Sequence, residues 1–198
     1  MLPWGHLGAG YFVYTIGTRV FLNRSPQRKP VLVLAIGTQF PDLIDKPLNW
    51  WFDIFDGRAI GHSLVITVPL CVLLFLVGRR SDRGNLAVGF SIGVITHLLG
   101  DAWGSLLTGN FEPIRYLLWP LLSAPTYPSD SFNDHLQQWL FYWDMKRVIP
   151  WRSFLVNRFG VQLLFALVAV LVWAADGFPG VRTVLNRIGR LRRDYRSP

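Results

Sequence analysis

The sequence is poor in the residues that stabilise soluble and secreted domains. Charged residues make up only 16% of its 198 residues, well below the soluble average of about 25%. The single cysteine, Cys71, excludes an internal disulfide, and its position in an apolar run predicts that it packs in the interior. No basic leader with a small-residue cleavage site follows Met1, so we expect no cleavable signal peptide. This balance favours lipid as the solvent of the fold.

Apolar residues make up 51% of the chain, including 9 Trp and 14 Phe, and they fall into five segments. The segments are about Trp4–Leu22, Pro30–Phe40, Ile60–Val77, Asn85–Leu107 and Phe159–Ala175. Four of them approach the ~20 residues that span a bilayer, whereas the second, with about 11 residues, is short. A short intramembrane helix is tolerated where its end is buried in protein or lines a cavity. The pattern predicts an all-α, polytopic membrane helix bundle with about five transmembrane segments.

The basic residues lie in short clusters between the apolar segments. The clusters are Arg19, Arg24, Arg28 and Lys29 at the end of the first segment and after it, Arg79, Arg80 and Arg83 after the third, and six arginines between 182 and 196. If the five segments alternate in direction, the positive-inside rule places the N-terminus outside and the C-terminus in the cytoplasm. The clustering also accounts for the net charge of +8 without a nucleic-acid partner, and it predicts contact with membrane lipids instead.

Residues 1–178 are predicted to form a single membrane-embedded helical domain, and residues 179–198 a basic cytoplasmic tail. Within the domain, the Trp- and Pro-rich stretch 108–158 is the only long segment outside the predicted spans, and it falls on the outer side. Its part Asp134–Val148 has apolar positions that suit a helix lying in the interface. We interpret this outer stretch as an interfacial belt and cap, with a substrate-guiding lid as the alternative.

Six ionisable residues lie in or beside the predicted spans, namely His6, Asp42, Asp45, His62, His97 and Asp101. An Asp at membrane depth costs roughly 2.5 to 3.5 kcal/mol on insertion scales, so such residues seldom persist without a partner. At 1.5 Å per residue from the cytoplasmic end of each segment, the five other than Asp45 reach similar heights of about 17 to 25 Å. In a hydrocarbon core of about 30 Å, that height lies in the outer leaflet. We therefore expect these five residues to meet there.

Helical spacing also directs these side chains inward. His97 and Asp101 are four residues apart and share one helix face. Small residues continue the ligand-bearing faces as stripes that admit a close neighbouring helix. They are Gly89 and Gly93 in the fourth segment, and Gly10 and Gly17 in the first. The polar residues are therefore predicted to point into the bundle rather than towards lipid.

Imidazole nitrogens and carboxylate oxygens together suit a divalent metal ion, with Zn²⁺ favoured and Mn²⁺ as the other candidate. Such an ion would neutralise the buried carboxylates, and an open position on it would make water available for hydrolysis near neutral pH. Two alternatives use the same residues: hydrogen bonding across helices for packing, and a proton or ion pathway. His135, in the outer loop, is interpreted as a surface residue and not as a ligand.

Five short motifs, in order along the chain, resemble the membrane-bound metal-dependent hydrolase family of prokaryotes typified by YdjM. They are Gly5-His6, Pro41-Asp42-Leu43-Ile44-Asp45, Gly61-His62-Ser63, His97-Leu98-Leu99-Gly100-Asp101 and Leu117-Leu118-Trp119-Pro120. The likeness covers about residues 4–122 and leaves out the fifth segment and the tail. Residues 37–47 are similar to the branch found in salt-loving archaea. The family often has His-Arg where this chain has Gly57-Arg58, so a second metal ion is not implied.

The resemblance implies a hydrolase with a divalent metal, in the cell membrane of a prokaryote as a multi-pass protein. It places the metal ligands on His6, Asp42, His62, His97 and Asp101. At an outer-leaflet site the expected substrate is a phospholipid or another lipid-linked phosphate ester, rather than a cytosolic small molecule.

Two residues beside the expected ligands are assigned catalytic roles. Asp45 is expected to act as a general base, or as a carboxylate that orients a histidine. Arg58 is expected to hold a substrate phosphate, with a headgroup contact as the alternative. The competing function is a non-catalytic membrane protein that has a structural metal site or a polar helix-packing cluster. A metal carrier is disfavoured because the cytoplasmic halves of the segments are apolar. The oligomeric state is left open.

Overall fold

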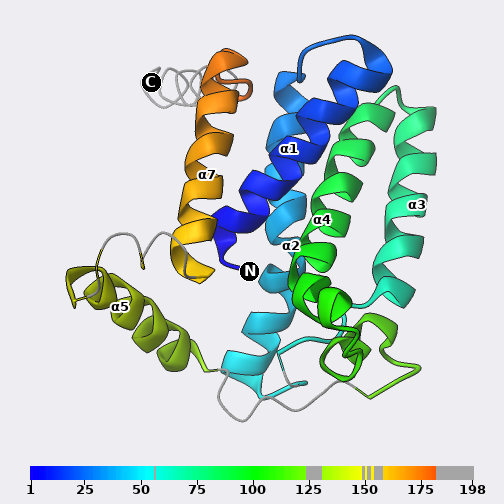
Figure 1. The fold of residues 1–198 in the computed structure, drawn as a ribbon. Coiled ribbons are helices and arrows are strands. Elements are labelled where there is room, and N and C mark those ends of the chain that lie inside the picture. The colour runs from blue at the N-terminus through cyan, green and yellow to red at the C-terminus, as the bar shows by residue number, and fades with distance from the viewer. Residues whose placement is uncertain (56, 124–130, 149, 151–152, 154–157, 182–198) are drawn as a thin grey trace, which may run out of the picture.

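The protein is all-helical, as the apolar segments predict. The computed structural model describes residues 1–55, 57–123, 131–148, 150, 153 and 158–181, and within them every regular element is a helix. The elements are α1 (Pro3–Leu22), α2 (Arg28–Phe52), α3 (Leu64–Arg80), α4 (Gly84–Thr108), the 3-10 helix η1 (Glu112–Leu118), α5 (Phe132–Val148) and α7 (Arg158–Ala175) (Figure 1). The basic tail is predicted over residues 179–198, and all of it from residue 182 onward lies outside the described residues.

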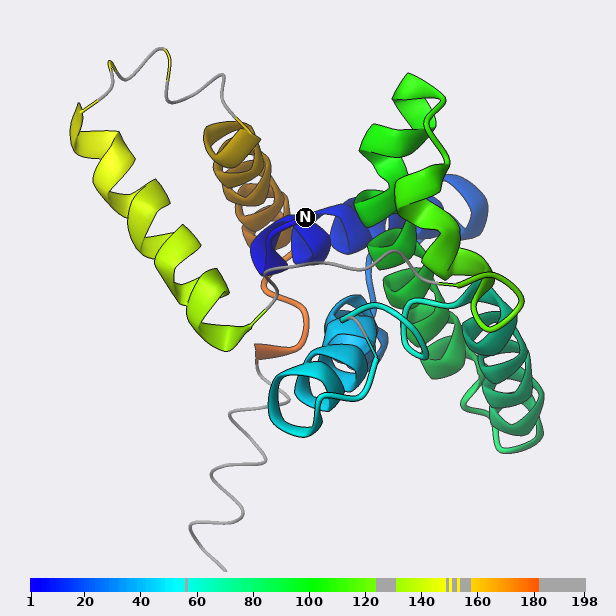
Figure 2. The same ribbon diagram turned by 90° about the horizontal axis from the view of Figure 1, so that it is seen from below.

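The helices α2 and α4 form the centre of the bundle and share its most extensive helix–helix contact. The helix α1 packs on both of them, α3 packs on α4, and α7 packs on α1 (Figure 1). The view from below shows α5 to one side of this bundle (Figure 2). Ring contacts tie α5 to its neighbours: Trp50 lies 5.5 Å from Phe132 and Tyr142 lies 5.0 Å from Phe159, measured between ring centroids.

Glycines allow α2 and α4 to approach at backbone distance. A Cβ atom at Gly37 would lie 2.3 Å from the carbonyl oxygen of Phe90, and one at Gly93 would lie 2.5 Å from that of Leu34. Both distances are too short for any side chain, so the predicted stripe on the fourth segment does serve close packing. The expectation for Gly17 is wrong, because a Cβ there would have no neighbour within 4 Å.

The second helix is longer than its apolar run. The sequence predicts a short span that ends near Phe40, whereas α2 continues through Pro41 and Pro47 to Phe52. Its polar second half stays helical because Asp45 is buried against the protein instead of facing lipid. The chain leaves α2 at Asp53, which has a left-handed backbone conformation and donates its amide to the carbonyl of Asn49.

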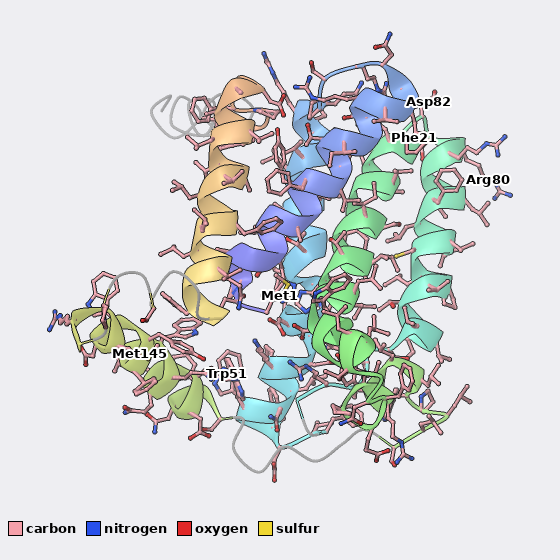
Figure 3. The ribbon with its side chains drawn as sticks, in the orientation of Figure 1. Met1, Phe21, Trp51, Arg80, Asp82 and Met145 are labelled. Atoms are coloured by element: carbon pink, nitrogen blue, oxygen red, sulfur yellow. The ribbon has the colours of Figure 1, made fainter. Side chains whose placement is uncertain are left out.

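The two ends of the bundle differ in character. The α1–α2 and α3–α4 connections lie together at one end, as does the chain leaving α7, and the first two basic clusters lie in these connections and the adjoining helix ends (Figure 1). Arg80 and Asp82 mark this end, and Trp51 lies near the other, with the α2–α3 loop and η1 (Figure 3). The arrangement matches the alternation on which the predicted orientation depends. The orientation in a membrane stays a prediction.

The outer surface of the bundle is apolar. On α3 and α7, Leu76, Leu167 and Leu171 are each more than half exposed. An exposed apolar surface of this extent marks a contact with lipid or with another protein. Among the described residues, α4 is long and apolar enough to cross a membrane, and Phe159–Ala175 of α7 forms a shorter apolar helix. The count of five spans therefore stays a prediction.

Candidate metal centre

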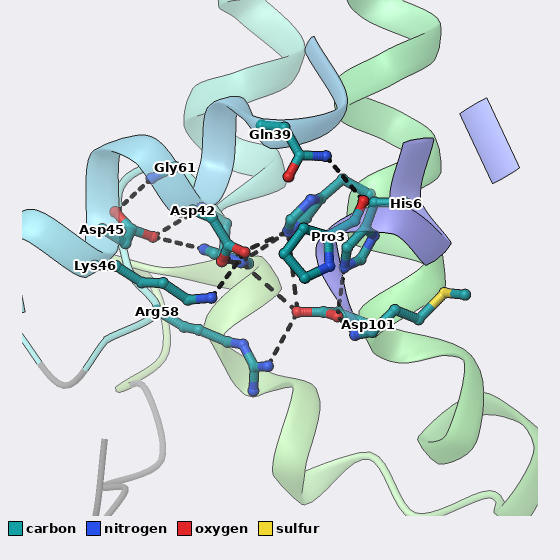
Figure 4. Close-up of polar contacts among 12 residues, drawn as sticks. Pro3, His6, Gln39, Asp42, Asp45, Lys46, Arg58, Gly61 and Asp101 are labelled. Carbon is teal, nitrogen blue, oxygen red and sulfur yellow. Dashed lines mark hydrogen bonds and ion pairs between the residues drawn. The ribbon is translucent and has the colours of Figure 1, made fainter. Parts of the chain in front are cut away.

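Residues from α1, α2, α4 and the α2–α3 loop converge on one buried site (Figure 4). The structure brings together all of the expected ligands, and the contributing residues are His6 from α1, Asp42 and Asp45 from α2, His62 from the loop, and His97 and Asp101 from α4. The three imidazoles are fully buried, with 0% exposure. One placement differs from expectation, because α3 begins at Leu64 and His62 therefore precedes the helix.

His62 is positioned by Asp45. The Asp45 carboxylate accepts hydrogen bonds from the backbone amides of Ala59 (2.8 Å), Gly61 (2.8 Å) and His62 (3.0 Å), and its Oδ2 lies 2.8 Å from His62 Nδ1. The loop also touches α2 directly, since a Cβ at Gly61 would lie 2.6 Å from the carbonyl oxygen of Pro41. The same carboxylate of Asp45 thus holds the α2–α3 loop against α2 and orients the ring of His62.

His97 is oriented in the same manner by a backbone group. Its Nδ1 lies 2.7 Å from the carbonyl oxygen of Thr38, which can only accept, so Nδ1 carries the proton. The same reasoning applied to Asp45 places a proton on His62 Nδ1. In the neutral rings, Nε2 is then a bare lone pair, and the two Nε2 atoms face each other at 3.2 Å. Two lone pairs at this distance repel unless a cation lies between them, either a metal ion or a proton that makes the contact an N–H···N hydrogen bond.

Carboxylates add further acceptors to the same point. Asp42 Oδ1 lies 3.6 Å from His62 Nε2 and 3.9 Å from His97 Nε2. Asp101 Oδ2 lies 3.7 Å and 4.0 Å from the same two atoms. In a tetrahedral Zn²⁺ site with bonds of about 2.0 Å, neighbouring ligand atoms are roughly 3.3 Å apart. The site therefore has both the atoms and the spacing to hold a divalent ion.

His6 supplies an independent test of that fit. Its ring stacks on His97 with the centroids 3.8 Å apart, and its Nε2 lies 3.2 Å from Asp101 Oδ1. Within the described part of the chain, neither ring nitrogen of His6 makes a well-aligned hydrogen bond, although both are buried. A buried polar group without a partner is costly and calls for an explanation. A cation held by His6 together with His97 and Asp101 would provide one, and these three atoms lie within 4.8 Å of one another.

Two cationic side chains border the carboxylates. Lys46 Nζ lies 2.8 Å from Asp42 Oδ2, and Arg58 lies 3.0 Å from Asp101 Oδ2 (Figure 4). The Arg58 guanidinium also lies over the Tyr116 ring, 5.3 Å from its centroid. The α-amine of Met1 contacts Asp101 as well. The sequence arguments missed Lys46, although its position four residues after Asp42 on one helix was a usable signal.

A cavity of about 640 Å³ opens directly onto these groups. Asp42, Lys46, Arg58 and Asp101 line its polar side. Aromatic side chains form much of the remaining wall, and they are Trp50, Trp51, Trp139, Tyr142 and Phe159. His135 also lines the wall, with its ring 5.4 Å from that of Trp50, and it belongs to neither of the His/Asp groups found in the described residues.

Comparison with known proteins adds one finding. A family model described as YdjM inner membrane protein matches residues 1–180. The match extends past Leu122, so α7 lies inside the family region, contrary to the shorter extent inferred from the motifs. No curated protein and no solved structure matches this chain. The likeness to a branch in salt-loving archaea stays a prediction.

Proposed function

Because the chain belongs to the YdjM inner membrane protein family, we propose that it is a multi-pass membrane enzyme that hydrolyses a phospholipid or another lipid-linked phosphate ester. The observation that carries this proposal is the pair of Nε2 atoms of His62 and His97, which face each other beside two carboxylates. That arrangement suits a divalent cation and opens onto a cavity with cationic side chains.

His6, Asp42, His62, His97 and Asp101 would hold the ion, with Zn²⁺ or Mn²⁺ as the candidates. When bound, such an ion supplies Lewis acidity to a phosphoryl oxygen and makes water acidic enough to react near neutral pH. The protein keeps His62 and His97 in the required tautomer through their Nδ1 contacts.

Asp45 would orient His62 instead of taking a proton from water. Its side chain is buried, and both of its oxygens accept hydrogen bonds from backbone amides of the loop. A general base needs a free lone pair within reach of the reacting water. Of the two roles that the sequence allows for Asp45, general base or orienting carboxylate, its contacts therefore favour the orienting carboxylate.

Lys46 and Arg58 would bind the phosphate of the substrate. Both are partly exposed to the cavity, and each now neutralises a carboxylate that a bound cation would neutralise instead. Released from these pairings, the Lys46 ammonium beside Asp42 and the Arg58 guanidinium beside Asp101 could both contact phosphate oxygens of the substrate. The aromatic wall suits the boundary between headgroup and acyl chain.

The alternative function is a non-catalytic membrane protein in which these residues form a polar packing cluster or a structural metal site. The ion pairs of Lys46 with Asp42 and of Arg58 with Asp101 favour it, because they balance the buried charges without a metal. The His6 ring argues for the cation, because its Nδ1 is buried without a hydrogen-bond partner among the described residues and its Nε2 has only the poorly aligned 3.2 Å contact with Asp101.

An assay on detergent-solubilised lipids tests the proposal. Wild type should release headgroup or phosphate from a phospholipid or lipid-linked phosphate, and chelation should abolish the release. Lys46→Gln should keep its metal and raise KM by about 10-fold or more, the usual effect of losing a charged hydrogen bond. Lys29→Gln is the matched control, because Lys29 is exposed at the far end of the same helix. Failure of metal-loaded wild type to cleave any such lipid would reject hydrolysis.

A further inference from the structure

A second cavity, of about 510 Å³, lies between α1, α2 and α7. Its volume falls within the range of about 300–1,000 Å³ that is usual for ligand pockets. Residues of all three helices line it, including Trp4, Leu7, Leu34, Ala35, Ala166 and Trp173. No charged side chain among the described residues lines it, so a charged ligand would find no ion-pair partner there.

Its lining residues carry few polar side-chain atoms, and two of the three polar groups are already engaged, whereas Trp4 Nε1 is buried without a hydrogen-bond partner among the described residues. Tyr11 donates its hydroxyl to Asp176 at 2.6 Å, and Trp173 donates Nε1 to the carbonyl oxygen of Pro179 at 3.0 Å. The remaining wall is hydrocarbon and indole ring. Such a cavity selects an apolar ligand by burial alone.

This apolar cavity lies next to the cavity at the metal centre, along the same helices. On α1, Pro3 lines the polar cavity and Trp4 lines the apolar one. On α7, Gln162 lines the polar cavity, and Ala166, one turn further along the helix, lines the apolar one. Figure 1 shows α7 running alongside α1, so the two cavities follow one another along the same pair of helices.

We propose that the apolar cavity holds an acyl chain of the lipid whose phosphate lies at the centre. From Trp4 to Tyr11 the wall rises about 10 Å at 1.5 Å per residue, a length that suits several methylene groups in extended form. The small side chains of Ala35, Ala166 and Ala169 leave the space that the chain would fill. The inference relies on the proposed function, which places the headgroup at the metal centre. It specifies a substrate with a long acyl chain in extended form.

Filling the cavity tests the proposal by a chain-length series. Ala166→Phe should lower kcat/KM for a long-chain lipid by about 10-fold or more, and leave a short-chain analogue with the same headgroup unchanged. Leu167→Phe is the matched control, because Leu167 is 54% exposed on the same helix and does not line the cavity. Ala35→Leu, from the α2 wall, repeats the test if Ala166→Phe folds poorly. An equal loss for both chain lengths would overturn the acyl-chain assignment.

A second readout does not need turnover. A phospholipid with a photoreactive diazirine at the end of its acyl chain should label wild-type peptides around Trp173, and Ala166→Phe should abolish that labelling. If wild type cleaves lipid but the label falls elsewhere, the acyl-chain assignment is wrong and the hydrolase proposal stands. If the label falls at Trp173 but no lipid is cleaved, the cavity binds lipid and the hydrolase proposal fails.

Discussion

The Asp45 carboxylate receives hydrogen bonds from three backbone amides and from the ring of His62. Its side chain is buried, so these bonds compete with little water and position the loop firmly. His62 therefore reaches the site with its Nε2 pointing inward, as does His97 through the carbonyl of Thr38. At the scale of single residues, the centre depends on the groups behind the ligands as much as on the ligands.

Replacing Asp45 by Asn should weaken the fold and the metal site together. The amide retains one acceptor but turns an NH₂ group towards backbone N–H donors, which costs about 1–3 kcal/mol of unfolding free energy. Metal affinity should fall 10- to 100-fold, the usual effect of removing a group that orients a ligand. Metal titration and thermal unfolding in detergent measure both quantities.

Asp53→Asn is the control for this substitution, because Asp53 is exposed at the end of the same helix and Asn tolerates its left-handed conformation. A different outcome would show that Asp45 acts as the general base. In that case Asp45→Asn would bind metal as tightly as wild type and lose only turnover, by about 10²- to 10⁴-fold.

At the scale of elements, the approach of α2 and α4 positions the centre. Thr38 and Asp42 on α2 meet His97 on α4 because Gly37 and Gly93 bring the two backbones together. A wider helix pair would carry the α2 groups away from His97. The glycines are thus part of the site although they bear no ligand.

Gly93→Ala should separate the helices and lower metal affinity as well as stability. Its Cβ would lie 2.5 Å from the carbonyl oxygen of Leu34 and 2.7 Å from the amide nitrogen of Thr38, and neither backbone atom can move freely. We expect a loss of 1–3 kcal/mol or more, the usual cost of overpacking. Gly17→Ala is the control, since open space there leaves only the gain of up to ~1 kcal/mol from better helix propensity. Equal unfolding temperatures and metal affinities for the two variants would contradict the account.

A buried carboxylate fastens α7 to α1 at the opposite end. Asp176 accepts hydrogen bonds from Tyr11 (2.6 Å) and Thr15 (3.1 Å), and it also pairs with Arg19. Burial alone would raise the pKa of Asp176, yet the hydrogen bonds from Tyr11, Arg19 and Thr15 hold that pKa below its usual range. A carboxyl with a depressed pKa stabilises the folded state above its unfolded pKa, and the benefit is lost as the pH falls through the folded pKa.

Asp176→Asn should therefore be less stable than wild type at pH 7, by about 1–3 kcal/mol. The difference should shrink below about pH 4, where the carboxyl of the unfolded chain becomes protonated, and it should be lost as the pH falls through the lower pKa of the folded state. Thermal unfolding of both proteins at pH 7 and pH 3 provides the comparison. A difference of the same size at both pH values would show that the charge of Asp176 is not what holds α7.

The sequence predicts the elements unevenly, for physical reasons. Apolar length locates α1, α3, α4 and α7 to within a few residues, because lipid and core both require continuous burial. Depth counting brings the five expected ligands together, since helical rise is fixed. The polar half of α2 was not predicted. Pro41 suggests that the helix ends there, and the sequence alone does not show that a later loop covers Asp45 and keeps this half of the helix buried. The contact of Thr38 with His97 depends on tertiary packing, which no local pattern specifies, whereas the pairing of Lys46 with Asp42 follows from their spacing of four residues once α2 is known to continue past Pro41.

At the scale of the whole molecule, the bundle has a basic end and a site end. The α1–α2 and α3–α4 connections, near Arg80 and Asp82, lie at the end away from Trp51, which lines the cavity at the metal centre (Figures 1 and 3). By the positive-inside rule, the basic end should face the cytoplasm and the site should lie near the outer membrane face.

Cysteine labelling in intact cells tests this orientation. In a Cys71→Ser background, an impermeant maleimide should react with Asn110→Cys, beyond the end of α4, and not with Ser81→Cys, in the α3–α4 turn. Both positions are exposed, so accessibility in permeabilised cells serves as the control. Labelling of Ser81→Cys alone in intact cells would reverse the assigned orientation.

The metal itself is the central claim, and elemental analysis of protein purified without chelators tests it most directly. Wild type should contain close to one divalent ion per chain, with Zn²⁺ or Mn²⁺ expected from the ligand types. His97→Ala should lose most of that ion, because His97 belongs to both His/Asp groups of the described residues, whereas His135→Ala should retain it. Well-folded wild type with no bound divalent ion, or His97→Ala with the wild-type content, would contradict the account.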